Sequence, residues 1–172
     1  LINFAHGDIF MMAGYFMIIC MTNFLLPWYV SIILVIAMTV ALGVLTEKIA
    51  YKPLRSAPRM SVMISAIGVS YLLQNLATYL FSALPKPYPT IGFLNTKVTI
   101  GSLSTSLVTF ITPILTILIV VGLVFLINKT KIGMAMRAVS KDFEVARLMG
   151  IKINNIISIT FVIGCALAAI GS

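Results

Sequence analysis

Residues 129–154 read KTKIGMAMRAVSKDFEVARLMGIKIN, and this stretch decides how the rest of the chain is organised. It is the longest polar interval in a chain that is otherwise almost entirely apolar. It holds six lysine and arginine residues but only two acidic residues, Asp142 and Glu144. Basic intervals between apolar segments are typical of loops on the cytoplasmic side of a membrane.

A short helix is predicted inside this interval, over roughly residues 141–149. Ser140 is a suitable N-cap, because its hydroxyl can accept a hydrogen bond from a free backbone amide one turn later. The two acidic residues lie near the positive end of the helix dipole, and Gly150 can end the helix in a left-handed conformation. The helix is too short to span a bilayer, which takes about 20 residues, and marginal alone in water. Because much of its circumference is apolar, we expect it to dock on another surface through the side chains of Phe143, Val145, Ala146, Leu148 and Met149.

The composition places the chain in a membrane. Hydrophobic residues make up 60% of its 172 residues, charged residues 9%, and mean hydropathy is +1.12, whereas soluble domains have about 25% charged residues. The net charge of +8 does not indicate nucleic-acid binding, because the basic residues lie in gaps between apolar runs. Cys20 and Cys165 lie inside apolar runs and are expected to be small core residues. The chain does not begin with Met, so we expect it to be part of a longer protein.

The pattern predicts an all-α, polytopic transmembrane bundle with about five spans, forming one domain over residues 1–172. Complete runs are about 20 residues long, which matches a helix crossing the hydrocarbon layer. Two intervals, 47–60 and 129–154, hold ten of the twelve basic residues and are predicted to be cytoplasmic. The intervals 23–27 and 85–104 are then external. The apolar runs are 9–22, 24–46, 61–84, 107–127 and one from residue 156 onward.

No catalytic or metal-binding constellation and no cofactor motif is visible in the sequence. The second, third and fourth runs contain no ionisable group, and a carrier driven by protons or sodium usually needs such groups inside its spans. Asn3, His6 and Asp8 could shape the entrance of a transport pathway, or Asp8 could be an ordinary helix N-cap in a loop. Gln74 and Asn75 lie in the third run, where contacts between helices are the favoured role and pathway lining is the alternative.

Several stretches together resemble one family, the LivH-type permeases of branched-chain amino-acid ABC importers. The matches cover nearly the whole chain in the order found in that family. At Met134 the chain departs from the pattern, because an arginine is expected after the glycine. The matching stretches are LINFAHGD at 1–8, EKIAYKPLR at 47–55, AIGVS at 66–70, LQNL at 73–76, TKIGMAMRA at 130–138 and ARLMGI at 146–151.

The resemblance implies a permease subunit of the bacterial inner membrane, without enzymatic activity or a cofactor of its own. It implies a second permease subunit, two cytoplasmic ATP-binding subunits and an extracytoplasmic substrate-binding protein, with further helices at both ends of the chain. Residues 129–154 would be the coupling loop that contacts the ATPase, with Phe143, Ala146, Leu148 and Gly150 as coupling residues. Leucine, isoleucine and valine are the expected substrates. A urea or short-amide permease of the same family, a secondary carrier and a membrane scaffold are the alternatives.

Overall fold

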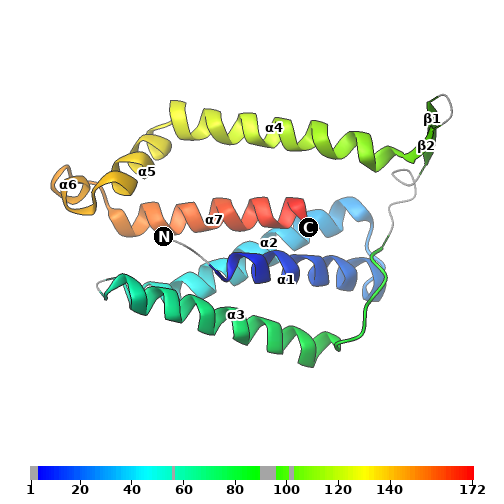
Figure 1. Ribbon diagram of the computed structural model, residues 1–172, viewed down its shortest axis with the longest axis horizontal. Helices are drawn as coiled ribbons and strands as arrows, with labels where there is room; N and C mark the ends of the chain where they lie inside the picture. Colours follow the sequence, from blue (N-terminus) through cyan, green and yellow to red (C-terminus); the bar gives the residue numbers. More distant parts are fainter. Residues whose placement is uncertain (1–3, 56, 90–95, 101–102) are drawn as a thin grey trace. The chain divides into compact units, whose positions relative to one another are not determined.

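The computed structural model describes residues 4–55, 57–89, 96–100 and 103–172. The chain divides into two compact units. The first comprises Leu1–Pro89 and Ile157–Ser172, and the second comprises Thr90–Ile156. Both are mainly helical (Figure 1), so the predicted helical fold is confirmed.

The N-terminal part of the first unit forms three helices, two of which begin directly after a proline. Helix α1 spans His6–Ile18 and continues as a π-helical turn, η1, over Ile19–Asn23. Helix α2 spans Trp28–Thr46 and continues as a second π-helical turn, η2, over Glu47–Tyr51. Helix α3 spans Arg59–Phe81. Proline precedes both α2 and α3, which suits a residue that is well tolerated at the start of a helix.

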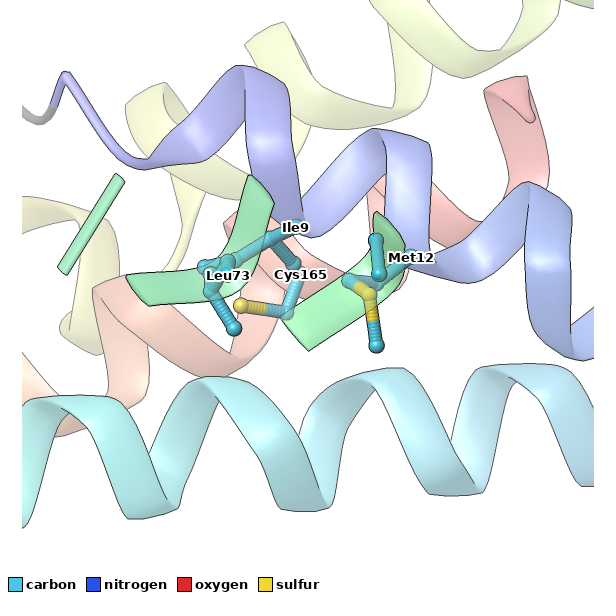
Figure 2. Packing of buried hydrophobic residues seen from close by; sticks show 5 residues of the cluster. Ile9, Met12, Leu73 and Cys165 are labelled. Carbon is cyan, nitrogen blue, oxygen red and sulfur yellow. The ribbon is translucent and has the colours of Figure 1, made fainter. Parts of the chain in front are cut away.

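Helix α7, Ile153–Gly171, contributes most of its length to the same unit. Its Cys165 lies in a cluster of buried residues with Ile9 and Met12 of α1 and Leu73 and Ala77 of α3 (Figure 2). Cys165 and Cys20 are both buried and free, which confirms that they are core residues.

Helices α2 and α7 approach each other closely at Gly43. A β-carbon added there would lie 2.1 Å from the sulfur of Cys165. The two residues therefore share one side-chain volume, as expected where a small residue lets two membrane helices approach.

The second unit consists of a hairpin and three helices. Strands β1, Lys97–Ile100, and β2, Leu103–Ser106, are antiparallel, with Lys97 opposite Ser106. Helix α4 follows over Leu107–Lys129, then α5 over Lys131–Lys141 and α6 over Phe143–Leu148. The hairpin lies in an interval that was expected to be an irregular external loop. None of the 23 residues of α4, all of which the structure describes, is buried.

Four helices in the described part of the chain are long and apolar enough to cross a membrane. They are Trp28–Tyr51, Met60–Phe81, Leu107–Lys129 and Ile153–Gly171. They correspond to four of the five predicted runs, and the protein is a multi-pass membrane protein. The remaining run forms α1, which has only 13 residues before its π-helical continuation.

Candidate functional site

The polar interval 129–154 folds into two helices instead of one. Thr130 caps α5, because its hydroxyl accepts a hydrogen bond from the backbone amide of Gly133 at 3.1 Å. Gly133 is required at this turn, since an added β-carbon would lie 2.2 Å from the carbonyl oxygen of Ile127. Helix α5 was not predicted from the sequence.

The cap of the shorter helix α6 corrects one prediction. Its N-cap is Asp142, whose carboxylate accepts hydrogen bonds from the amides of Glu144 at 2.8 Å and Val145 at 3.1 Å. Ser140 lies inside α5, and its hydroxyl donates to the carbonyl of Arg137. The extended backbone of Asp142, with φ −152°, ends α5 and begins α6, so the capping residue lies two positions later than predicted.

The end of α6 lies where the sequence predicted it. Gly150 has a φ of +79°, which is left-handed. The amide of Gly150 donates to Arg147, and the amide of Ile151 donates to Ala146, both at 3.1 Å. These bonds occupy carbonyl groups that the helix leaves free at its end, so the predicted closure at Gly150 is confirmed.

The residues predicted to couple to the ATPase differ in accessibility. Phe143 is 45% exposed and Leu148 is 86% exposed, whereas Ala146 is only 2% exposed. Val145 and Met149 add further exposed apolar surface, and Glu144, Arg147 and Leu148 line an open hollow. Helix α6 thus presents exposed apolar side chains, whereas Ala146 is buried. The coupling roles of these residues stay predictions.

The candidates near the chain start are only partly brought together. Asp8 lies in the first turn of α1 and is 9% exposed. Its carboxylate accepts one hydrogen bond from the Ser70 hydroxyl at 2.5 Å and one from the Gln74 amide at 2.9 Å. The alternative that Asp8 is an N-cap is therefore wrong, because Ala5 occupies that position. Asp8 instead connects α1 to α3, the role favoured for the polar residues of the third run.

The remaining candidates lie apart from this contact. His6 is exposed at the start of α1. The Asn75 amide donates to the carbonyl of Tyr71 in its own helix, at 2.7 Å. Asn3 lies outside the described residues. The Asp8 contact thus contains two of the predicted residues, Asp8 and Gln74, together with Ser70.

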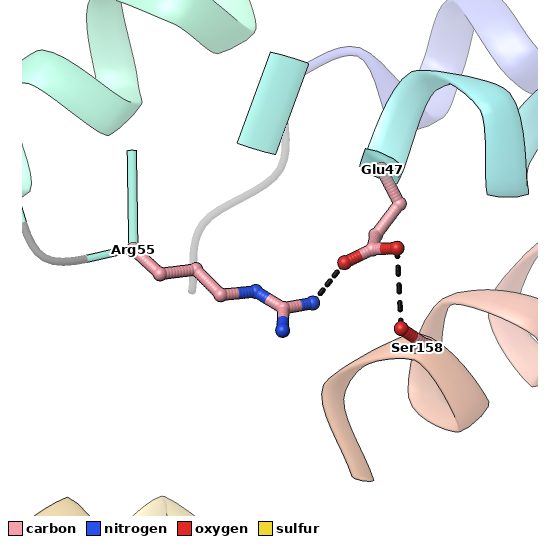
Figure 3. Close-up of polar contacts among 3 residues, drawn as sticks. All are labelled: Glu47, Arg55 and Ser158. Carbon is pink, nitrogen blue, oxygen red and sulfur yellow. Dashed lines mark hydrogen bonds and ion pairs between the residues drawn. The ribbon is translucent and has the colours of Figure 1, made fainter. Parts of the chain in front are cut away.

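A buried ionic contact was missed in the sequence analysis. Glu47, at the start of η2, is 1% exposed and forms an ion pair with Arg55 (Figure 3). Its second carboxylate oxygen accepts a hydrogen bond from the Ser158 hydroxyl of α7 at 3.1 Å. Burial lowers the pKa of Arg55 below its ordinary value. The signal was present, since Glu47 directly follows an apolar run and Arg55 lies eight residues later, but both were assigned to a solvated loop.

The ion pair between Glu47 and Arg55 bears on the prediction that the second apolar run lacks charged groups. Residues 24–46 contain no acidic residue, histidine, lysine or arginine, but the helix continues through Glu47 and Lys48. Because Arg55 supplies the opposite charge, Glu47 is held as a paired carboxylate. Among the described residues, no group of three or more His, Cys, Asp or Glu could hold a metal ion.

Comparisons with known proteins agree with this architecture. The family described as "Branched-chain amino acid transport system / permease component" matches residues 1–172. Permease protein BraD of a high-affinity branched-chain amino acid transport system from Pseudomonas aeruginosa is 34% identical over 183 residues, covering 100% of this chain and 60% of BraD. LivH of Salmonella typhimurium is also 34% identical, covering 99% of this chain and 59% of LivH.

A more distant relative is a probable LivH permease from Methanocaldococcus jannaschii, 26% identical over 98% of this chain and 54% of the relative. No solved structure matches. The chain spans about three fifths of the length of the bacterial relatives. The match over its full length nevertheless shows that the chain belongs to the family of permease components of branched-chain amino acid transport systems.

Proposed function

We propose that this chain is the permease subunit of an ATP-driven importer for leucine, isoleucine and valine. The proposal is supported by the family match and by the relatives BraD and LivH, which are permease proteins of high-affinity branched-chain amino acid transport systems. Four helices of membrane-spanning length provide the bundle that such a subunit needs. The bundle would alternate between inward-open and outward-open states, while ATP is hydrolysed by separate subunits.

The observation that carries the proposal is the exposed apolar surface of α6. The helix has six residues, is capped at both ends and is flanked by basic residues. A fixed helix with uncovered apolar side chains is suited to insertion into a groove of a soluble partner. We assign this partner as the ATP-binding subunit, with Phe143 and Leu148 as contacts, Ala146 as the packing residue beneath them and Gly150 as the residue that fixes the helix end.

The remaining partners follow from the type of transporter. A second permease subunit would complete the bundle, and an extracytoplasmic binding protein would deliver the amino acid. The uncovered apolar helices would lie against lipid or the second subunit. Asp8, His6, Asn3, Gln74 and Asn75 remain weaker candidates for the substrate pathway. A permease for urea or short amides would share all these features. Substrate competition would distinguish it from a permease for branched-chain amino acids.

The proposed orientation places intervals 47–60 and 129–154 in the cytoplasm of a bacterial inner membrane. Single cysteines at Lys141 and Lys97, in a background without Cys20 and Cys165, test this arrangement. An impermeant thiol reagent added to intact cells should label position 97 and leave position 141 unlabelled. Labelling of position 141 from outside would overturn the orientation.

The proposed contact is tested by Leu148→Glu, which places a charge at the most exposed apolar position of α6. Membrane levels should stay normal, because this side chain has little contact with its own unit. The ATP-binding subunit should no longer co-purify, and leucine uptake should be lost. Met134→Glu, at another exposed apolar position of the same interval, is the matched control. Full uptake with Leu148→Glu and a bound ATPase would rule out α6 as the contact.

Substrate class is tested in the full transporter with its binding protein. Labelled leucine uptake should be competed by isoleucine and valine and unaffected by excess urea. Competition by urea but not by valine would favour the alternative permease.

The role of Ala146 is tested by Ala146→Glu, which should also abolish uptake. Because Ala146 is buried, the membrane level of this variant must be compared with that of Leu148→Glu. A stable, fully active Ala146→Glu protein would remove Ala146 from the coupling residues.

A further inference from the structure

The π-helical turn η2 contacts two different helices. Towards α7, Glu47 accepts the hydrogen bond from Ser158 at 3.1 Å, and the ring of Tyr51 lies 5.3 Å from that of Phe161. Towards α3, the carbonyl of Ala50 accepts a hydrogen bond from the Ser65 hydroxyl at 3.1 Å. A segment of five residues thus connects α7 with α3.

The buried carboxylate of Glu47 fixes the position of η2, because it cannot easily move away from its partners. Glu47 is fully desolvated apart from its contacts with Arg55 and Ser158. Moving Glu47 away from both partners would leave an uncompensated buried charge, which is strongly unfavourable. Single π-helical turns inside α-helices are rare and occur frequently at functional sites. Glu47 therefore fixes where η2 lies against α7, because the carboxylate has to stay beside both Arg55 and Ser158.

The chain sequence connects this contact to α6. Only residues 149–152 separate α6, which ends at Leu148, from α7, which begins at Ile153. Ser158 is five residues into α7, which is about one and a half helical turns. A displacement of α6 would act on the start of α7, and Ser158 there donates a hydrogen bond to the buried Glu47 carboxylate.

We propose that η2 transmits the displacement of α7 to α3 during transport, with Glu47 as the positioning residue. This inference rests on the proposed function, since it takes α6 as the site where the ATP-binding subunit acts. Ser158 and Phe161 are the input side of η2, and Ser65 is the output side. The contact between η2 and α7 stays closed through the cycle, so that both segments move together.

The first test uses the assembled transporter with Glu47→Gln, Ser158→Ala and Ser65→Ala. Thr78→Ala is the matched control, because the Thr78 hydroxyl bonds only within its own helix, to the carbonyl of Gln74. Each variant is measured for membrane level, co-purified ATPase, ATP hydrolysis and leucine uptake. We expect the ATPase to stay bound and uptake per ATP hydrolysed to fall by about two- to thirtyfold, with Glu47→Gln the most affected.

A second test covers the case in which Glu47→Gln does not reach the membrane. Cysteines at Tyr51 and Phe161, in a background without Cys20 and Cys165, are joined by a bifunctional maleimide, which leaves Glu47, Arg55 and Ser158 in place. The cross-linked transporter should keep its uptake. The same cross-link should restore uptake per ATP in the Ser158→Ala background, because it replaces the lost hydrogen bond with a covalent one.

The outcomes separate this inference from the proposed function. Normal uptake per ATP in Ser158→Ala and Ser65→Ala would overturn the inference and leave the α6 contact intact. Loss of uptake on cross-linking would also overturn it, because the contact would then have to open. Loss of the bound ATPase in these variants would instead show that η2 supports α6 assembly and transmits nothing.

Discussion

The two buried carboxylates of the first unit, Asp8 and Glu47, are held in different ways. Asp8 accepts hydrogen bonds from two neutral side chains, Ser70 and Gln74, both on α3. Glu47 is paired with the cation of Arg55 and also bonds Ser158 of α7. The difference shows that burial alone does not determine how a carboxylate is held, because the charge of its partners also matters. The partners of Asp8 are dipoles, whereas Glu47 belongs to an ion pair.

The largest effect is expected when Glu47 loses its cation. Arg55→Ala leaves a buried charge without its partner, which costs about 3–5 kcal/mol. We expect low membrane levels and a clearly lower unfolding temperature in detergent. Lys52→Ala, an exposed lysine in the same segment, should be close to wild type. An Arg55→Ala protein as stable as Lys52→Ala would show that Glu47 is not held as an ionic pair.

A smaller effect is expected for Asp8→Asn, which keeps the shape of the side chain and removes its charge. Hydrogen bonds to charged groups contribute about 1.5–3 kcal/mol, roughly twice the neutral value, so stability should fall by about 1–2 kcal/mol. Membrane level and ATPase association should be kept, and leucine uptake should decrease if Asp8 shapes the pathway. Unchanged uptake would leave Asp8 as a structural contact between α1 and α3 only.

The smallest effect is expected at two adjacent side-chain amides of α3, those of Gln74 and Asn75. Gln74→Ala removes a donor to Asp8 and should cost about 1 kcal/mol, the usual value for one hydrogen bond. Asn75→Ala removes a donor to the carbonyl of Tyr71, which already lies in a helix, and should be nearly silent. Thermal unfolding of the two purified variants under the same conditions checks this. Equal losses would mean that the Asp8 contact has no special role in joining the helices.

The long helices could be predicted because their signal is local and repeated. Apolar runs of about 20 residues require helices in lipid, where each backbone group must pair within its own segment. The runs 24–46 and 107–127 correspond to α2 and α4 within a few residues. Glycine adopts the left-handed conformation without the steric cost that other residues have, which likewise made the end of α6 at Gly150 predictable.

The features that were missed depend on where neighbouring segments lie. Ser140 and Asp142 are both good caps by type, and only the length of α5 decides between them. The β1–β2 hairpin has a short, polar pattern that resembles an external loop. Glu47 was read as a loop charge because the sequence does not show that Ser158, 111 residues later, lies within hydrogen-bond distance. Asp8 and Gln74 were singled out separately, but their contact could not be predicted.

The shared volume at Gly43 and Cys165 has a consequence for the evolution of the family. A β-carbon at position 43 would lie 2.1 Å from the Cys165 sulfur and 3.1 Å from its β-carbon, so the sizes of the two side chains are coupled. Alanine at position 43 is compatible with glycine at position 165, and a side chain of the size of cysteine at 165 favours glycine at 43. Relatives that keep this helix crossing should therefore show covariation in side-chain size between the two sites, even though 122 positions separate them in the chain.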